Sequence, residues 1–265
     1  MDLSIDMLGS AEQYAAIDSA DDPVWSQYTS ETRDIVRSLR ILGGQQTHPV
    51  ILSALNNFNS EGMAKLLRLL EVVVVRYLLI GGGNTGRFET TCAVLARQIH
   101  TKQVKNAVEA FHEFKTVYPT DEEFKQSFRI KQERSNPKVQ YFLRHIEQQA
   151  ISQEQHAAGA ELRPGTLTVE HILPRHPGND WDDVIANDHA IAEDCAFRLG
   201  NMCLLSDAAN LKAAGRTFDE KRKILEKSGL ITTRTIAKHD RWDRQNIDHH
   251  QAYLAKLATD TWRFP

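Results

Sequence analysis

The sequence is poor in cysteine. Only Cys92, Cys195 and Cys203 occur among 265 residues, and no CxxC pair is present. Disulfide frameworks and cysteine-rich zinc sites both need more cysteines, in paired spacings. Both are therefore excluded, and a reducing, cytoplasmic location is the expectation that fits best.

Long uninterrupted apolar runs are also missing. The longest, residues 66–80, is broken by Arg68, Glu71 and Arg76, and charged side chains are costly in contact with lipid. The opening residues, MDLSIDMLGSAEQY, lack the basic-then-apolar order of a signal peptide. We therefore predict neither a membrane segment nor a secretion signal.

The third absence is an excess of basic charge. The formal net charge is -3, from 32 Lys+Arg against 35 Asp+Glu. A chain that binds nucleic acid over much of its surface carries a basic excess, so any contact with DNA must here be local. With 41% hydrophobic and 25% charged residues, the composition is otherwise that of a globular protein.

The sequence does show helical periodicity. Apolar residues recur every three or four positions from residue 30 to residue 149, with clear stretches at 88–99, 104–114, 121–132 and 137–149. Residues 151–165 are instead polar and small and include a Pro-Gly turn, as at a seam between domains. We predict a helical domain at residues 1–155 and a second domain at residues 156–265.

The sequence changes character after this seam. Residues 166–173 (TLTVEHIL) and 201–205 (NMCLL) have the composition and alternation of short strands. Ser206 suits the N-cap of a short helix, and Thr217 with Glu220 forms a capping box for the next. The order strand, long loop, strand, helix, helix predicts an α+β chain that is mostly α.

The segment GGGNTG, residues 81–86, matches the GxGxxG pattern of a dinucleotide-binding turn. The valines before it, however, continue a helical period that begins near Glu61, and no second strand ending in an acid follows. A helix that ends at glycine and is followed by another helix explains the motif without a ligand. We therefore predict no cofactor site here.

Two motifs stand close together in the second part of the chain: Val169-Glu170-His171-Ile172-Leu173-Pro174 and Leu199-Gly200-Asn201-Met202-Cys203-Leu204-Leu205-Ser206. Asn210 follows Asn201 by nine positions, and Phe218-x-x-Lys221 comes next. In these residues the chain resembles the C-terminal HNH domain of GmrSD-type modification-dependent restriction endonucleases. The resemblance continues through Trp242 and Ile247 to Trp262-Arg263-Phe264-Pro265, although His250 stands where an arginine is expected.

This resemblance implies a helical N-terminal domain followed by a ββα-metal (HNH) nuclease domain, and a role for each motif residue. His171 would be the general base, since the ordinary histidine pKa of about 6.5 suits proton transfer at neutral pH. Glu170 and Asn210 would ligate one Mg²⁺ or Mn²⁺ through a carboxylate and an amide oxygen. Asn201 would hydrogen-bond backbone across the loop and hold His171 in place.

Strand geometry sets a condition on this site. Neighbouring strand residues face opposite sides, so Glu170 and His171 can reach one pocket only through a twist or bulge at the strand end. Taken singly, such a histidine is more often a hydrogen-bonded core residue, and an asparagine after glycine more often belongs to a turn. Their order and spacing together favour the catalytic interpretation.

Further side chains near the motifs are candidates for contacts with nucleic-acid phosphates, with solvated surface residues as the alternative: Arg175, His176, Lys212 and Lys221. The loop between the two strands is crowded with acids, which would repel DNA, so we expect it to point away from the substrate.

The resulting expectation is a metal-dependent HNH endonuclease that nicks or cuts double-stranded DNA in restriction or anti-phage defence, in a modification-dependent way by the same resemblance. No P-loop is present, so a nucleotide-hydrolysing, DNA-sensing partner domain or subunit is also expected, with this chain a fragment or one partner of a complex. Two alternatives stay open: a nucleic-acid-binding module whose nuclease motif has decayed, and an HNH nuclease that acts on RNA.

Overall fold

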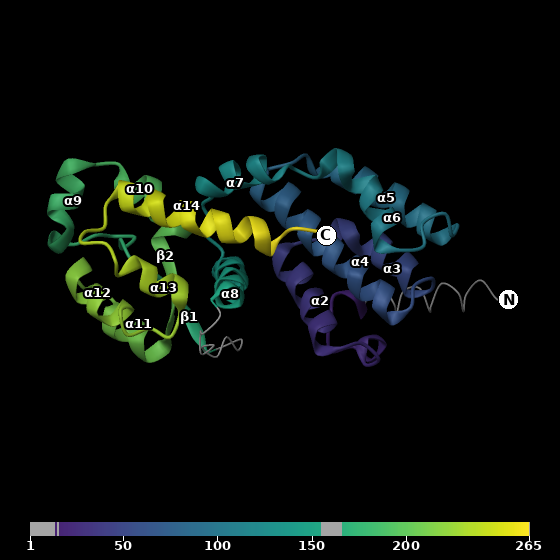
Figure 1. The fold of residues 1–265 in the computed structure, drawn as a ribbon, viewed down its shortest axis with the longest axis horizontal. Helices are drawn as coiled ribbons and strands as arrows, with labels where there is room; N and C mark the ends of the chain where they lie inside the picture. The colour runs from purple at the N-terminus through teal and green to yellow at the C-terminus, as the bar shows by residue number, and fades with distance from the viewer. Residues whose placement is uncertain (1–13, 15, 155–165, 265) are drawn as a thin grey trace. The chain divides into compact units, whose positions relative to one another are not determined.

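The structure, a computed structural model, describes residue 14, residues 16–154 and residues 166–264. These residues are mostly helical, with one two-stranded sheet among them, which confirms the prediction of a mostly α, α+β chain. They form two compact units (Figure 1). Unit 1 takes the described residues up to Thr120 and from Trp262 on, and unit 2 is Asp121–Thr261. No described helix is long and apolar enough to cross a membrane.

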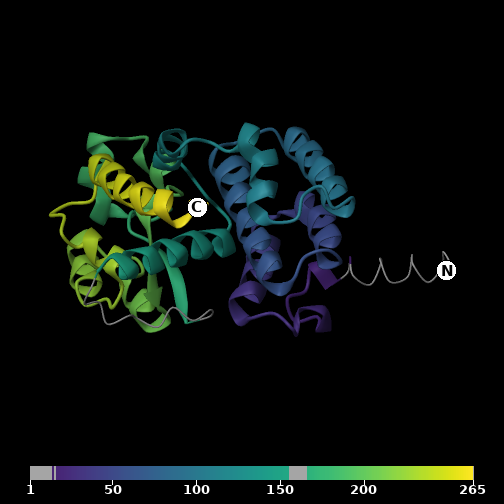
Figure 2. The ribbon, with the colours of Figure 1, turned by 45° about the vertical axis from the view of Figure 1, so that its right-hand side comes forward.

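The described residues of unit 1 up to Thr120 form helices joined by loops, and they run from purple to teal in Figure 2. Its central helix, α4, packs against the helices on either side of it in sequence and is buried along most of its length. The elements are η1 (Pro23–Trp25), α2 (Ser30–Leu42), η2 (Gln45–Thr47), α3 (His48–Leu55), α4 (Ser60–Val73), the π-helix η3 (Val74–Ile80), α5 (Thr85–His100), α6 (Ala107–Phe114) and η4 (Lys115–Val117).

The glycine-rich segment joins two helices, as predicted. The π-helix η3 ends at Gly81, where a side chain would collide with the carbonyl of Arg76, and Asn84 caps α5 through the N–H of Arg87 at 2.8 Å. The backbone at Gly83 packs against the ring of Tyr77. The close approach that glycine allows here is therefore used by a side chain of the protein itself.

Unit 2 contains the sheet and the helices packed on it. It consists of α7 (Asp121–Arg129), α8 (Asn136–Gln153), β1 (Leu167–His171), η5 (Asn179–Trp181), α9 (Asp182–Asn187), α10 (Ile191–Cys195), η6 (Leu199–Asn201), β2 (Met202–Ser206), α11 (Asp207–Ala213), α12 (Phe218–Leu225), α13 (Ile231–Ile236) and α14 (Arg244–Thr261). The predicted caps are present, with Ser206 at the start of α11 and the capping box of Thr217 and Glu220 at α12.

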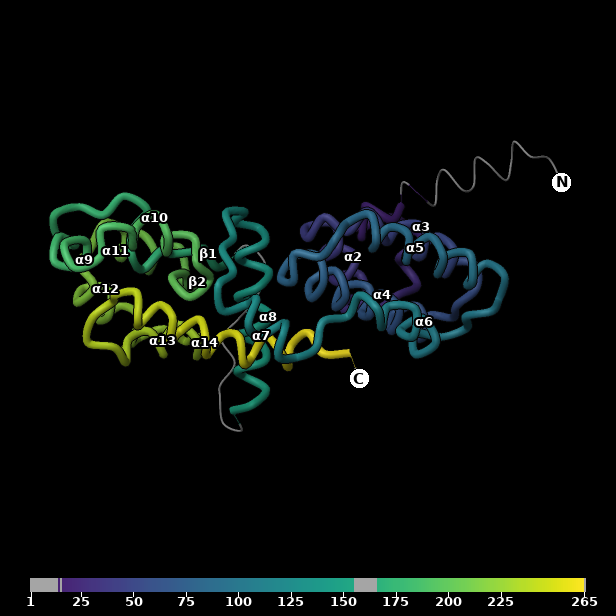
Figure 3. Tube along the Cα trace, turned by 90° about the horizontal axis from the view of Figure 1, so that it is seen from above, coloured from purple at the N-terminus to yellow at the C-terminus, as the bar shows by residue number. Residues whose placement is uncertain are grey.

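β1 and β2 pair antiparallel, with Glu170 opposite Cys203 and His171 opposite Met202. Residues directly opposite in an antiparallel pair share a face of the sheet. One face, which we call the α11 face, carries Glu170 and Cys203, and Cys203 belongs to a core that also includes Ala213 of α11. The other, the α8 face, carries His171 and Met202. Figure 3 shows the strands between α11 and α8, and α8 packs against both strands.

The helices before the sheet belong to the same unit as the sheet. α7 and α8 pack against α14, and Glu147 of α8 is fully buried. Its carboxylate accepts hydrogen bonds from the N–H groups of Ile231 and Thr232, at 2.6 and 2.9 Å, and from the Thr232 hydroxyl at 2.6 Å. The boundary predicted between residues 155 and 156 therefore falls inside unit 2, and most of the predicted seam, residues 155–165, lies outside the described residues.

Replacing Glu147 by alanine is expected to lower the free energy of unfolding by about 3 kcal/mol, because two buried N–H groups at the start of α13 lose their acceptor. Urea denaturation followed by circular dichroism measures this change. Glu154→Ala, at an exposed position on the end of the same helix, is the control and should shift stability by less than about 0.5 kcal/mol. Equal shifts for the two variants would contradict the anchoring role.

Candidate functional site

His171 is the last residue of β1, and its ring is half-buried. The rings of His171 and Phe197 are nearly perpendicular, with centroids 5.8 Å apart and planes at 87°. Neither ring nitrogen hydrogen-bonds to a described residue, and Nε2 is buried. A buried polar atom without a partner is uncommon and often marks a position where a ligand or reacting group completes the hydrogen bonding.

The surroundings of His171 favour its neutral form. Burial, then the positive charges of Arg175 and Lys221, lower the pKa of the imidazole to about 4. A neutral imidazole keeps a lone pair that can accept a proton, but a ring with this pKa is a weaker base than one with the ordinary value of about 6.5 expected from the sequence.

Asn201 is fully buried and fixes the chain just beyond His171. Strand pairing stops at His171, and Asn201 extends it: its backbone carbonyl accepts from the N–H of Ile172 at 2.9 Å. The side chain then accepts from the N–H of Leu173 and donates to the carbonyl of Leu173, both at 2.9 Å. Trp242 Nε1 donates to the same Asn201 oxygen at 2.9 Å. The contacts with Ile172 and Leu173 are to backbone groups, and the contact with Trp242 is between side chains.

Gly200 explains why glycine precedes this asparagine. A side chain at Gly200 would lie 2.6 Å from the carbonyl of Ile247 and against Gln251, so only glycine lets α14 pack this closely. His250 Nδ1 lies 2.8 Å from the Gly200 carbonyl. The buried turn that carries Asn201 is therefore held by α14.

Asn210, on α11, points its amide nitrogen at β1. Nδ2 lies 2.8 Å from the Thr168 hydroxyl and 3.2 Å from the Val169 carbonyl. A carbonyl only accepts hydrogen bonds, so the amide nitrogen must face it and the orientation of the amide is settled. Oδ1 is left without a hydrogen bond from any described residue.

Glu170 and Lys221 form a buried ion pair. Lys221 Nζ lies 2.5 Å from Glu170 Oε1 and donates to the carbonyl of His171 at 2.7 Å. Lys221 is 1% exposed and Glu170 is 8% exposed. The sequence predicts a phosphate contact for Lys221. In the structure the Lys221 side chain points toward the sheet instead. The capping box fixes the start of α12, and Lys221 then lies on the same buried side of the helix as Phe218. Its charge neutralises Glu170 rather than a phosphate.

The site residues lie on the two faces of β1. Glu170 and Asn210, through Thr168, lie on the α11 face, whereas His171 lies with Phe197 on the α8 face. The register is regular as far as His171, so no bulge in β1 brings Glu170 and His171 together. Groups from the two faces can meet only beyond the end of the strand.

The oxygens available on the α11 face suit a hard cation. Glu170 Oε2 and Asn210 Oδ1 accept no hydrogen bond from the described residues. Mg²⁺ commonly takes one or two protein oxygens and keeps several waters, and carboxylate and amide oxygens are donors of the type it takes. In the described part of the chain no three or more His, Cys, Asp or Glu side chains gather as a metal cluster.

The remaining predicted residues lie at the surface. Arg175, His176 and Lys212 are exposed, and the Arg175 guanidinium lies 5.1 Å from the centroid of Phe197. Arg134 lies over the same ring at 4.1 Å. Sequence reasoning missed Phe197 and Arg134, because neither belongs to a motif and their proximity to His171 arises only from folding.

A family model described as GmrSD restriction endonucleases, C-terminal domain, matches residues 118–257, more than half of the chain. The match begins close to the start of unit 2 and includes every site residue discussed above. No match was found among curated proteins.

Asn201→Asp is expected to lower the free energy of unfolding by about 3 kcal/mol. The new oxygen would face the carbonyls of Leu173 and Ala196, to which the amide nitrogen now donates, and would bury a charge. Urea unfolding followed by tryptophan fluorescence measures the loss, since Trp242 contacts this side chain. The control is the exposed Asn187→Asp, and an unchanged midpoint in Asn201→Asp would contradict the assigned hydrogen bonds.

Acid is expected to weaken the fold through His250. Burial lowers the pKa of this histidine to about 4, and its short contact to Gly200 makes Nδ1 the protonated nitrogen of a neutral ring. Between about pH 6.5 and pH 4, His250 is protonated in the unfolded chain and neutral in the folded chain. The equilibrium constant for unfolding should therefore rise by up to about tenfold for each pH unit of acidification in this range.

This pH dependence can be isolated by comparing urea midpoints at pH 7.5 and 5.0 in the wild type and in His250→Asn, which keeps a donor near Nδ1 but does not titrate. The variant should lose less stability on acidification than the wild type. An identical loss in both proteins would show that His250 is not responsible.

Proposed function

This chain belongs to the family of GmrSD restriction endonuclease C-terminal domains, and on that premise we propose that unit 2 is a metal-dependent HNH endonuclease that cleaves double-stranded DNA. The observation that carries the proposal is an antiparallel strand pair followed by α11, the two strands being separated in sequence by η5, α9, α10 and η6. His171 Nε2 at the end of β1 and Asn210 Oδ1 on α11 have no hydrogen-bond partner among the described residues, and Asn201 holds the backbone just after His171. The role would be restriction, or defence against phage DNA, including modified DNA.

In this proposal His171 is the general base. Its neutral ring would take a proton from a water molecule that attacks phosphorus at the end of β1. The hydrogen bonds of Asn201 to Leu173 would keep the backbone after His171 from moving, so that Asn201 acts through His171. Phe197 would limit rotation of the ring by contact with its edge.

Glu170 Oε2 and Asn210 Oδ1 would hold one Mg²⁺ or Mn²⁺. When bound, the ion would polarise the phosphate and neutralise charge on the leaving oxygen. Lys221 would fix the Glu170 carboxylate by occupying Oε1, and Thr168 would fix the Asn210 amide by accepting from Nδ2. Arg175, His176 and Lys212 would contact phosphates next to the cleaved bond.

The proposal extends to the organisation of the protein. The HNH motif lies within residues 156–265, the proposed nuclease domain, and α7 and α8 of the proposed helical domain pack beside it in unit 2. A nucleotide-hydrolysing, DNA-sensing partner domain or subunit would direct the nuclease to its DNA. Family membership supports this part of the proposal.

Plasmid cleavage tests the nuclease. The full chain is incubated with supercoiled plasmid, with and without modified bases, in Mg²⁺, Mn²⁺ or EDTA. Cutting is expected with either metal ion and not in EDTA, and His171→Ala should lower the rate by about a hundredfold or more. The exposed His189→Ala is the matched control. Cutting in EDTA, or undiminished cutting by His171→Ala, would refute the mechanism.

The same experiment separates the alternatives. Binding of DNA without any cutting under these conditions would support the decayed binding module. Cleavage of labelled RNA but not of DNA would support a nuclease directed at RNA. An Asn210→Ala variant that cuts normally would remove Asn210 from the proposed metal site.

A further inference from the structure

Phe197 joins two guanidinium groups to His171. The Cζ atoms of Arg134 and Arg175 lie over its ring, 4.1 and 5.1 Å from the centroid, and the His171 ring meets it edge-on. Arg134 comes from the segment before α8 and Arg175 from the loop after β1. Phe197 precedes η6, so three separate segments converge beside the end of β1.

Both guanidinium groups are available to a ligand. Arg134 and Arg175 are exposed, and neither guanidinium forms an ion pair or hydrogen bond with a described residue. Stacking on an aromatic ring restrains the plane of a guanidinium while leaving its N–H edge free, and that edge matches two oxygens of a phosphate.

Backbone hydrogen bonds fix the position of the segment that carries Arg134. The N–H of Glu133 donates to the carbonyl of Phe197 at 2.9 Å, and the N–H of Leu199 to the carbonyl of Lys131 at 3.3 Å. Residues 131–133 thus run alongside residues 197–199. Glu133 hydrogen-bonds the backbone of Phe197, and this pairing places the next residue, Arg134, at the Phe197 ring.

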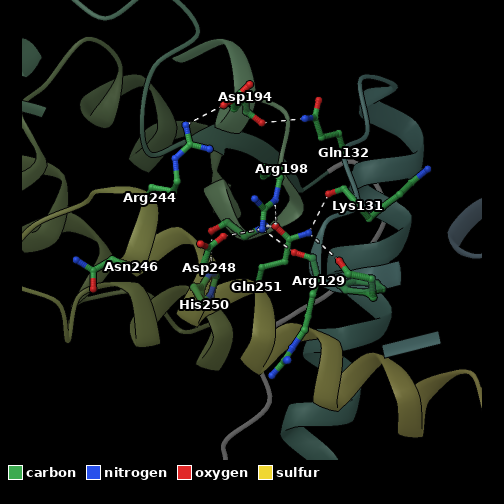
Figure 4. A network of polar contacts seen from close by, with 12 residues as sticks. Arg129, Lys131, Gln132, Asp194, Arg198, Arg244, Asn246, Asp248, His250 and Gln251 are labelled. Carbon is green, nitrogen blue, oxygen red and sulfur yellow. Dashed lines mark hydrogen bonds and ion pairs between the residues drawn. The ribbon is translucent and has the colours of Figure 1, made fainter. Parts of the chain in front are cut away.

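The buried side chains of Arg198 and Gln251 hold this segment through hydrogen bonds to its backbone (Figure 4). Arg198 donates to the carbonyl of Arg129 at 2.6 Å and to Gln251 at 2.6 Å, and Gln251 donates to the carbonyl of Lys131 at 2.9 Å. Asp248 accepts from Arg198 at 2.9 Å. The segment is therefore anchored to α14, the helix that also supports the Asn201 turn.

From this arrangement we infer that Arg134 and Arg175, stacked on Phe197, form a phosphate clamp that binds the backbone of the DNA strand to be cleaved beside His171. Arg134 is thereby a positioning residue of the nuclease, supplied by the helical region that precedes the HNH motif. The inference rests on the proposed function. It adds a DNA-binding surface made by Arg134, Arg175 and Phe197, of which only Arg175 adjoins the motif at residues 169–174.

The test measures DNA affinity in a His171→Ala background, so that cleavage does not interfere. Anisotropy of a fluorescein-labelled 30-base-pair duplex is titrated with the full chain between 50 and 200 mM salt. Arg134→Ala should weaken binding about tenfold and reduce the slope of log affinity against log salt by about 0.9, the value for one lost phosphate contact. The exposed Arg97→Ala on α5 is the control and should change neither quantity.

Arg134→Lys distinguishes a stacked clamp from a bare charge. It should keep the wild-type salt slope, since the charge remains, yet lose about threefold or more in affinity, since lysine cannot bind bidentately. Phe197→Leu should also weaken binding with no change in net charge. Urea midpoints show whether each variant is folded.

The outcomes separate this inference from the proposed function. If Arg134→Ala leaves affinity and slope unchanged while His171→Ala abolishes cleavage, the clamp is refuted and the nuclease stands. If His171→Ala cuts normally, the nuclease mechanism fails whatever the clamp does. Absence of measurable DNA binding by the folded chain would overturn the clamp as well.

Discussion

The buried carboxamide of Asn201 is the contact on which the geometry of the site depends. A two-stranded sheet of five residues per strand is marginal by itself, and its pairing stops at His171. Asn201 continues the pairing with its side chain, turns the backbone of Leu173 inward and accepts from Trp242. Gly200 lets α14 support that turn at close range. The direction in which His171 leaves the sheet is thus set by groups far away in the sequence.

Strand alternation then divides the chemistry of the site between two faces. Carboxylate and amide oxygens lie on the α11 face, and the imidazole lies on the α8 face with Phe197. In the proposed mechanism, groups from the two faces would meet a phosphate beyond the end of β1. Beside Phe197, residues 131–133 pair with residues 197–199, so the segment before α8 contributes to the α8 face.

Local rules anticipated much of this from the sequence. The strands appear within a few residues of the predicted ranges, the caps at Ser206 and Thr217 are present, and the glycine segment joins two helices. These features depend on neighbours along the chain. The Glu170–Lys221 pair and the stacking of Arg134 on Phe197 do not: they join residues more than fifty positions apart, and no periodicity encodes such a contact. The sequence likewise does not predict the π-helix over residues 74–80, because its apolar pattern also fits an α-helix.

Charge pairing explains how an acidic chain can still bind DNA at one place. Several basic residues that follow α11 are paired with acids: Arg216 with Glu220, Arg222 with Asp240, Arg241 with Asp243, and Arg244 with Asp188. Such surface pairs add little stability, but each acid offsets the positive charge of its partner. The guanidinium groups at Phe197 also have no acid partner among the described residues, so two uncompensated positive charges lie beside His171. In the proposed nuclease, these two guanidinium groups would supply positive charge to the DNA backbone beside His171, even though the chain as a whole is acidic.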